Sequence, residues 1–166
     1  MQRIDIPSII IPKIVIPEIN TTDNINYAGR NLLLNSGIKY ENNSYPICSY
    51  NITKYHLLQN KTKITISMDA DIAENHVINC YSDEGYWPIT KNNMEYDSEL
   101  GLYIKQCYSS IPSTPKFPNS TRLSVYILPF DNPYPTNTIR KCKLELGWND
   151  HPVWTPAPED TLPPTE

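Results

Sequence analysis

The feature that most restricts the fold of this chain is its proline content. The 166 residues include sixteen prolines and only five glycines. Each proline fixes the backbone angle φ and lacks an N–H donor, so it interrupts a helix and is excluded from the central strands of a sheet. Prolines at this frequency suit turns, sheet edges and extended segments. They therefore argue against a helix-rich protein.

Residues 1–20 contain a proline at every fifth position of a repeat. The stretch IDIPSIIIPKIVIPEI, residues 4–19, is a pentapeptide Ile-x-Ile-Pro-x that occurs three times. This spacing forbids a helix and a regular strand ladder, so it predicts an extended, polyproline-like arm. The arm carries these isoleucines: Ile4, Ile6, Ile9, Ile11, Ile14, Ile16 and Ile19.

An extended arm cannot bury its isoleucines on itself, although they are too apolar to remain in water. They must pack on the chain's own domain, on two copies of the arm in a homotrimer, or in a groove of another protein. We favour the intermolecular alternatives, in which the arm anchors or oligomerises the chain. The arm therefore indicates assembly and not catalysis.

After a polar linker, the hydrophobic pattern takes the period of two that half-buried strands require. Segments 61–68, 77–81, 100–108 and 123–130 are predicted strands. In 61–68 one face is expected to be core and the other wet, whereas 123–130 is expected to be buried on both faces. The final strand, from Arg140, alternates three apolar with three charged residues: Cys142, Leu144 and Leu146 against Lys141, Lys143 and Glu145. About seven to nine such strands with turn residues between them predict an all-β sandwich.

Two motifs at the ends of this region carry a resemblance to a known family. Residues 30–37 read RNLLLNSG, and residues 141–147 read KCKLELG before WTPAPED at 154–160. This pair is similar to the opening and closing motifs of carbohydrate-binding-module-like domains in bacteriophage tail and fibre proteins. The resemblance implies a jelly-roll β-sandwich, over about residues 24–160, that is carried on a virion. Residues 161–166 are predicted to be a flexible tail.

Composition and spacing exclude several other classes. The net charge of −4 provides no basic face for nucleic acid, and no apolar run approaches the about 18 residues of a membrane span. Scattered histidines and well-separated cysteines make a metal site or another cofactor unexpected. The cysteines are Cys48, Cys80, Cys107 and Cys142. We favour reduced, mostly buried thiols over two disulfides.

The only tight acidic group follows the predicted strand 61–68. Asp69, Asp71 and Glu74 supply oxygen ligands close enough in sequence to hold calcium. The two aspartates share a face only if the strand continues through them. A solvated turn after the strand is the favoured interpretation.

Aromatic residues are the candidates for a glycan site, because Tyr and Trp rings pack on the C–H faces of pyranoses. Residue type and position in a loop or on a strand single out Tyr86, Trp87, Tyr103 and Trp148. Ordinary packing is the competing interpretation for each of them. Trp154, which lies within the closing motif, is expected to close the sandwich.

These observations predict a bacteriophage virion structural protein of the head-fibre or tail-fibre type. Its sandwich would bind a host surface glycan during attachment, and its arm would contact other virion proteins or the copies in a trimer. The alternative is a decoration protein of the capsid or tail whose sandwich binds no sugar. An enzyme is not expected, and no catalytic residue is assigned, because the sequence offers no nucleophile–base pair and no carboxylate pair suited to hydrolysis.

Overall fold

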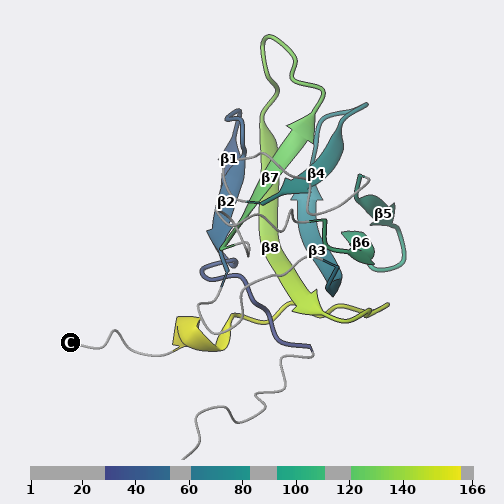
Figure 1. Ribbon diagram of the computed structural model, residues 1–166. Helices are drawn as coiled ribbons and strands as arrows, with labels where there is room; N and C mark the ends of the chain where they lie inside the picture. Colours follow the sequence, from purple (N-terminus) through teal and green to yellow (C-terminus); the bar gives the residue numbers. More distant parts are fainter. Residues whose placement is uncertain (1–28, 53–60, 83–92, 111–120, 162–166) are drawn as a thin grey trace, which may run out of the picture.

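The computed structural model describes residues 29–52, 61–82, 93–110 and 121–161. The isoleucine arm and residues 162–166 of the predicted tail lie outside this part. The described elements (Figure 1) are β1 (Tyr40–Asn42), β2 (Cys48–Asn51), β3 (Lys63–Asp71), β4 (Val77–Tyr81), β5 (Glu95–Asp97), β6 (Leu102–Tyr108), β7 (Arg122–Leu128), β8 (Asn137–Leu146) and the short helix η2 (Pro158–Thr161). None of the helical structure in the described ranges has the length or apolar composition of a membrane span.

The strands form two antiparallel sheets. The larger has the order β1-β8-β3-β6-β5 and the smaller the order β2-β7-β4. Strands β1 to β4 alternate between the sheets, and the first strand pairs with the last, with Tyr40 opposite Ile139. Just before β5, the Met94 N–H donates to the Ile78 carbonyl of β4 at 2.9 Å, so the chain contacts the smaller sheet before it joins the larger. This is a jelly-roll β-sandwich, and the predicted all-β fold is confirmed.

The core lies between the inner faces of the two sheets. The predicted strand 77–81 coincides with β4, and its Ile78 and Cys80 are fully buried beside Val125 and Ile127 of β7. The expectation that 123–130 is buried on both faces is wrong, because the chain leaves β7 at Leu128 and Phe130 lies exposed.

All four cysteines are free thiols, and three of them are buried, in agreement with the favoured interpretation. Burial raises the pKa of the Cys48 thiol to about 12. Because only the thiolate is strongly nucleophilic, this core cysteine is chemically inert at neutral pH.

The outer face of the larger sheet is buried where β3 and β8 pair, although its polar residues were expected to face water. Thr65, Ser67, Lys143 and Glu145 all belong to this face and all are buried. The physical reason is that the loop after β8 folds back across the sheet. Asn149 in that loop donates from its backbone N–H to Thr65 and from its side chain to Glu145.

The opening and closing motifs lie against each other and form what we call the terminal seam, residues 31–37 with 154–160. The Asn31 side chain donates to the carbonyl oxygens of Cys142 and Thr155 at 3.2 and 3.0 Å. The Trp154 indole N–H donates to Ser36 Oγ at 3.3 Å. Its ring lies so close to Gly37 that a Cβ there would be 2.9 Å from Trp154 Cζ2. Trp154 therefore has the structural role expected of it.

The seam also pairs with the outer edge of β8. The Leu32 N–H donates to the Leu144 carbonyl at 2.8 Å, and the Cys142 N–H donates to the Ser36 carbonyl at 3.1 Å. At the far end of the seam, the Asn35 N–H donates to the Asp160 carboxylate at 2.9 Å. Backbone groups that the short strand β1 leaves unpaired on β8 are thus satisfied by the opening motif.

Candidate functional site

The loop that follows β8 presents Trp148 to solvent. Gly147 turns the chain at a φ of 85°, which glycine adopts without steric cost. The Gly147 N–H donates to the Lys63 carbonyl at 2.9 Å, which ties the start of the loop to the beginning of β3. Trp148 is consequently held beside the end of the larger sheet.

Trp148 shares this position with one residue from each of two paired strands. Lys63 of β3 lies opposite Tyr108 of β6. The rings of Tyr108 and Trp148 meet edge to face with centroids 6.0 Å apart, and Lys63 Nζ lies 4.7 Å from the centroid of the Trp148 ring. Trp148 and Tyr108 are 56% and 52% exposed, so each ring keeps surface available to a ligand. We call these three residues the platform.

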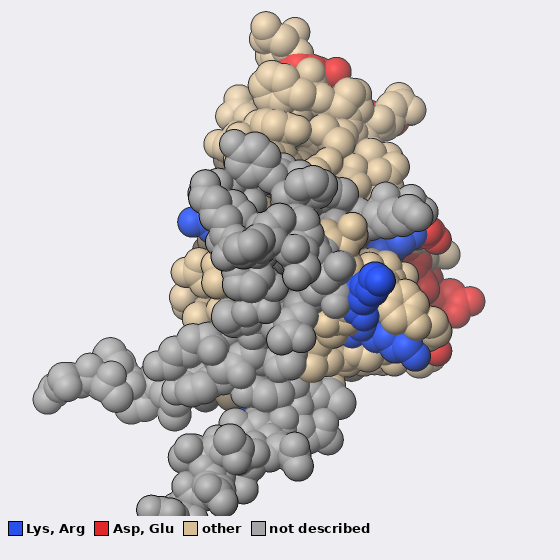
Figure 2. Space-filling view, viewed as in Figure 1, with Lys and Arg blue, Asp and Glu red and all other residues tan. Residues whose placement is uncertain are grey.

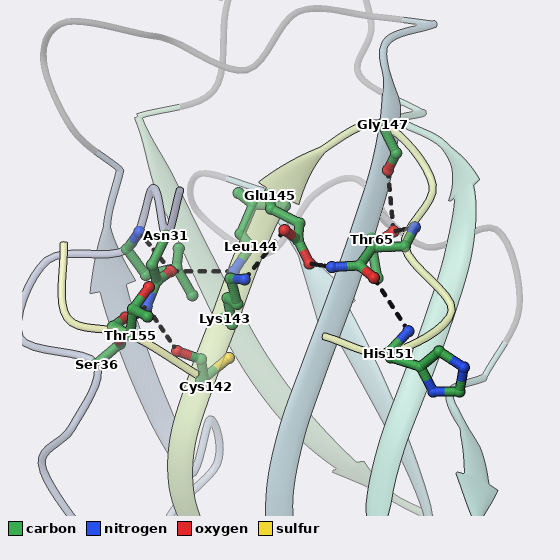
Figure 3. A network of polar contacts seen from close by, with 12 residues as sticks. Asn31, Ser36, Thr65, Cys142, Lys143, Leu144, Glu145, Gly147, His151 and Thr155 are labelled. Atoms are coloured by element: carbon green, nitrogen blue, oxygen red, sulfur yellow. Dashed lines mark hydrogen bonds and ion pairs between the residues drawn. The ribbon is translucent and has the colours of Figure 1, made fainter. Parts of the chain in front are cut away.

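A network of buried polar groups fixes the loop that carries Trp148 (Figure 3). Lys143 Nζ lies 3.0 Å from Glu145 Oε2, and both side chains are almost fully buried. The other oxygen of Glu145 accepts from Asn149 Nδ2 at 2.9 Å. Thr65 Oγ1 donates to the Gly147 carbonyl and accepts from the Asn149 N–H, both at 2.9 Å. The loop is therefore ordered before any ligand arrives, which lowers the entropy that binding would lose.

On one side of this loop the outer face is hollowed next to β5. This cavity, the β5 hollow, has a volume of about 400 Å³ and is lined by Glu95, Tyr96, Asp97, Ile104, Lys105, Gln106 and Asp150. Gln106 Nε2 donates to Asp150 Oδ1 at 2.8 Å, and Lys105 Nζ donates to Glu95 Oε1 at the same distance. The hydrogen bond from Lys105 lowers the pKa of the Glu95 carboxyl. Figure 2 shows the acidic and basic side chains gathered on this side of the molecule.

On the other side of the loop is a second cavity of about 330 Å³, which we call the Trp154 hollow. It is lined by Ser67, Asp69, Leu100, Leu102, Lys141, His151, Pro152, Val153 and Trp154. Leucine, proline, valine and indole groups make up more than half of the residues that line it. The polar groups are one hydroxyl, one carboxylate, one ammonium and one imidazole.

Asp69 at the margin of the Trp154 hollow belongs to an ion-paired group. Because β3 runs to Asp71, Asp69 and Asp71 do share a face, and Arg140 of β8 pairs with both. Arg140 Nη1 lies 2.9 Å from Asp69 Oδ1, and the hydrogen bond with Asp71 raises the pKa of the guanidinium. The expected solvated turn is therefore wrong, and a guanidinium lies where calcium would need to bind. Among the described residues, no three metal-ligating side chains are grouped.

The platform and both hollows lie along one strand. Tyr108, Gln106, Ile104 and Leu102 alternate with the inward-facing residues of β6, and they span about 20 Å at the usual rise per residue. Tyr108 belongs to the platform, Gln106 and Ile104 to the β5 hollow, and Leu102 to the Trp154 hollow. An elongated polar molecule can lie along this track, with aromatic surface at one end and hydrogen-bonding groups beside it.

The predicted glycan residues do not form a single cluster. Trp148 meets Tyr108, whereas Tyr103 lies on the inner face of β6, opposite the fully buried Met68. Tyr103 packs against the core and against Tyr96, with ring centroids 5.1 Å apart, and burial raises its pKa. Tyr86 and Trp87 lie outside the described residues.

Sequence reasoning missed the polar groups of the platform and of the adjoining β5 hollow. Lys63, Gln106 and Asp150 come from three separate segments, and only the pairing of β3 with β6 and the return of the loop bring them together. The available signal was the alternation in 100–108, which places Gln106 and Tyr108 on the same outward face.

A second group of aromatic side chains, which we call the aromatic tip, was also missed. It lies at the end of the sandwich opposite η2, where the loop between β7 and β8 projects (Figure 1). Tyr45 contacts Tyr126 and Phe130 at centroid distances of 4.7 and 5.0 Å, and Phe130 contacts Tyr134 at 5.1 Å. Tyr134 is buried and donates to the Ile127 carbonyl at 2.6 Å, whereas Tyr45 and Phe130 are exposed.

Comparison with known proteins gives one structural neighbour. No protein-family model and no curated protein matches the sequence. Among solved structures, the chain is similar to one described as "Structure of the tripod (BppUct-A-L) from the baseplate of bacteriophage Tuc2009", with a TM-score of 0.41 and 13% sequence identity. The match covers 81% of this chain and 61% of that chain, so this chain spans less than two thirds of the length of its neighbour.

Proposed function

We propose that this chain is a bacteriophage virion protein whose jelly roll binds a host surface glycan along the outer face of β6. The single observation that carries the proposal is the platform, where Trp148 and Tyr108 expose aromatic surface beside an ammonium group. The resemblance of the opening and closing motifs to phage fibre domains supports the virion assignment.

The chemistry of the face suits sugar recognition. The apolar C–H face of a pyranose packs on an indole or phenol ring, and its hydroxyls need donors and acceptors nearby. Lys63 supplies donors at the platform, and Gln106 and Asp150 supply both kinds of group in the adjoining hollow. Because the buried network already orders the loop, the ligand meets a preformed surface.

The test is binding of the purified full chain to an array of bacterial surface polysaccharides, followed by affinity measurement on the best ligand. Trp148→Ala should weaken that binding at least tenfold, because stacking on one aromatic ring is lost. Phe130→Ala is the matched control, since it removes an equally exposed ring at the opposite end of the sandwich. Equal affinity in wild type and Trp148→Ala would overturn the proposal.

The proposed interaction is binding without hydrolysis. The carboxylates that line the two hollows are all engaged in hydrogen bonds. Glu95, Asp150 and Asp69 accept from neighbouring side chains, and Asp97 accepts from the backbone N–H groups of Glu99 and Leu100. The hydrogen bond from Lys105 lowers the pKa of Glu95 and so favours its ionised form. A glycosidase requires one carboxylic acid that remains protonated to donate to the leaving group. Release of new reducing ends from a bound polysaccharide would contradict this part of the proposal.

We also propose that the isoleucine arm anchors the chain by assembling it into a trimer or by docking on another virion protein. The solution mass of the full chain should be compared with that of a chain starting at Asp23. A trimer that becomes a monomer on truncation supports oligomerisation by the arm. If the full chain and the truncated chain are both monomers, trimerisation by the arm is excluded. The arm would then dock on another virion protein.

The aromatic tip favours a second candidate, a decoration protein that packs on neighbouring virion proteins. Exposed Tyr45 and Phe130 form an apolar surface suited to a protein contact. This candidate predicts that Phe130→Ala impairs incorporation into virions while Trp148→Ala does not affect adsorption. The glycan proposal predicts normal incorporation and impaired adsorption for Trp148→Ala.

A further inference from the structure

The Trp154 hollow has the properties of a small-molecule site that is distinct from the platform. Its volume of about 330 Å³ falls within the range of natural ligand pockets, and its lining combines apolar walls with a few polar groups. Trp154 is held in place from outside the hollow, because its N–H bonds to Ser36 and its ring packs on Gly37. The indole is therefore a fixed wall.

Lys141 lies on the outer face, as its alternation with Lys143 and Glu145 predicts, and it lines this hollow together with Trp154. The register between β3 and β8 shifts between Ser67 and Asp69, and Lys141 takes a φ of 46°, which is unusual for a residue with a side chain. Bulges of this kind change the face that a neighbouring residue occupies. Here the bulge places Arg140 opposite Asp69, so Arg140 and Lys141 share the outer face.

Lys141 is the cation in this region whose charge is not neutralised. Arg140 pairs with Asp69 and Asp71, and Lys143 pairs with Glu145. Within the described ranges no carboxylate forms an ion pair with Lys141. Asp69 is the one carboxylate that lines the hollow, and Arg140 already holds it. An anion that enters the hollow would therefore meet a positive charge with little competition.

We propose that the Trp154 hollow binds a sugar unit that carries an anionic substituent, either a carboxylate or a phosphate. The sugar ring packs between Trp154 and Leu102, and the anionic group accepts hydrogen bonds from Lys141, with His151 beside it. This inference takes the ligand class from the proposed glycan function, because both surfaces lie along the same strand. It differs from that function in naming a charge requirement and a second site.

The experiment is an NMR titration of the full chain with four probes: glucuronate, glucose 6-phosphate, glucose and inorganic phosphate. We expect saturable shifts of the Leu102 and Lys141 amides and the Trp154 indole with one or both anionic sugars. Glucose and inorganic phosphate should bind at least tenfold more weakly, because each lacks half of the recognised group. Comparing the two anionic sugars identifies the substituent.

Three variants locate the charge requirement. Lys141→Gly removes the ammonium and suits the positive φ, so the fold is preserved. It should reduce affinity for the anionic sugar about tenfold or more, as expected for loss of a charge-assisted hydrogen bond. Lys141→Arg should retain affinity, and the matched control Lys39→Met, which removes an exposed lysine that lines neither hollow, should leave it unchanged.

Several results would overturn the inference. They are equal binding of glucose, absence of saturable shifts with both anionic sugars, shifts confined to the platform, and unchanged affinity in Lys141→Gly. If polysaccharide binding still depends on Trp148 in any of these cases, only the charge requirement of the Trp154 hollow is lost and the proposed function stands. If Trp148→Ala binds polysaccharide normally while Lys141→Gly loses the anionic sugar, the proposed role of the platform is lost and the anionic site in the Trp154 hollow stands.

Discussion

Trp148 and Trp154 lie six positions apart in one loop, yet they occupy opposite kinds of environment. Trp154 is half-buried in the terminal seam, with its N–H bonded and its ring against Gly37. Trp148 is 56% exposed, and its ring meets the ring of Tyr108 and the ammonium of Lys63. One ring closes the fold and the other is available to a ligand.

The difference arises from residues far away in the sequence. Ser36 and Gly37, from the opening motif, contact Trp154, whereas no segment of the described ranges covers Trp148 at the end of the sheet in this way. The residue type is the same, so local composition does not decide between structure and function. What decides is whether a distant segment covers the ring.

The largest effect is expected at the buried ion pair of Lys143 and Glu145, which also holds Asn149 of the loop. Glu145→Gln leaves the buried Lys143 ammonium without its counter-charge, and the free energy of unfolding should fall by about 3–5 kcal/mol. Denaturant titration followed by circular dichroism measures this. Glu41→Gln is the control, because Glu41 pairs with Lys39 on the surface, where solvent screening leaves an ion pair with little effect on stability. Similar losses in both variants would contradict the buried role of Glu145.

Trp154→Ala tests the structural side of the comparison. Removal of this half-buried ring leaves a cavity in the seam and leaves Ser36 Oγ with only its hydrogen bond from Asn31, which should cost about 2–3 kcal/mol of unfolding free energy. The same denaturant titration applies. A loss below about 0.5 kcal/mol would place Trp154 with ordinary surface residues.

Gly37→Ala should have a smaller effect that depends on Trp154. The new Cβ would lie 2.9 Å from the ring, so repacking should cost about 1–2 kcal/mol. In a Trp154→Ala background the same change should cost almost nothing, because the clash is gone. A double-mutant cycle measures this coupling, and additive losses would mean that the two residues do not contact each other.

Trp148→Ala should have the smallest effect on folding. Its ring is exposed and makes no hydrogen bond within the described residues, so unfolding free energy should change by no more than about 0.5 kcal/mol. Glycan binding should nevertheless be lost. A destabilisation comparable to that of Trp154→Ala would remove the contrast between the two tryptophans.

The all-β fold could be predicted from the sequence because alternation and turn residues are local signals. Segment 77–81 coincides with β4, and the apolar side of the last strand, including Cys142 and Leu144, lies in the core. The burial of Lys143 and Glu145 could not be predicted, because it depends on a loop that folds back over the sheet. A pattern shows which residues share a face, but it does not show what covers that face.

Only part of the candidate site could be predicted from the sequence, for a related reason. Trp148 could be selected as a loop aromatic, but its partners come from β3 and β6 and depend on the sheet register. Tyr103 was also selected as an aromatic candidate, but it occupies an inward-facing position in the alternation of β6 and packs against the core. The bulge beside Lys141, which places Arg140 opposite Asp69, leaves no local signature at all.

The terminal seam has a consequence for the order of events during synthesis. The first described residues bond to the last ones: Asn31 to Thr155, Asn35 to Asp160, and strand β1 to strand β8. Contacts between such distant positions form slowly, since the whole intervening chain must close as a loop. The opening motif therefore stays without these partners until almost all of the domain has been synthesised. The sandwich can therefore close only after β8 and the closing motif have been synthesised.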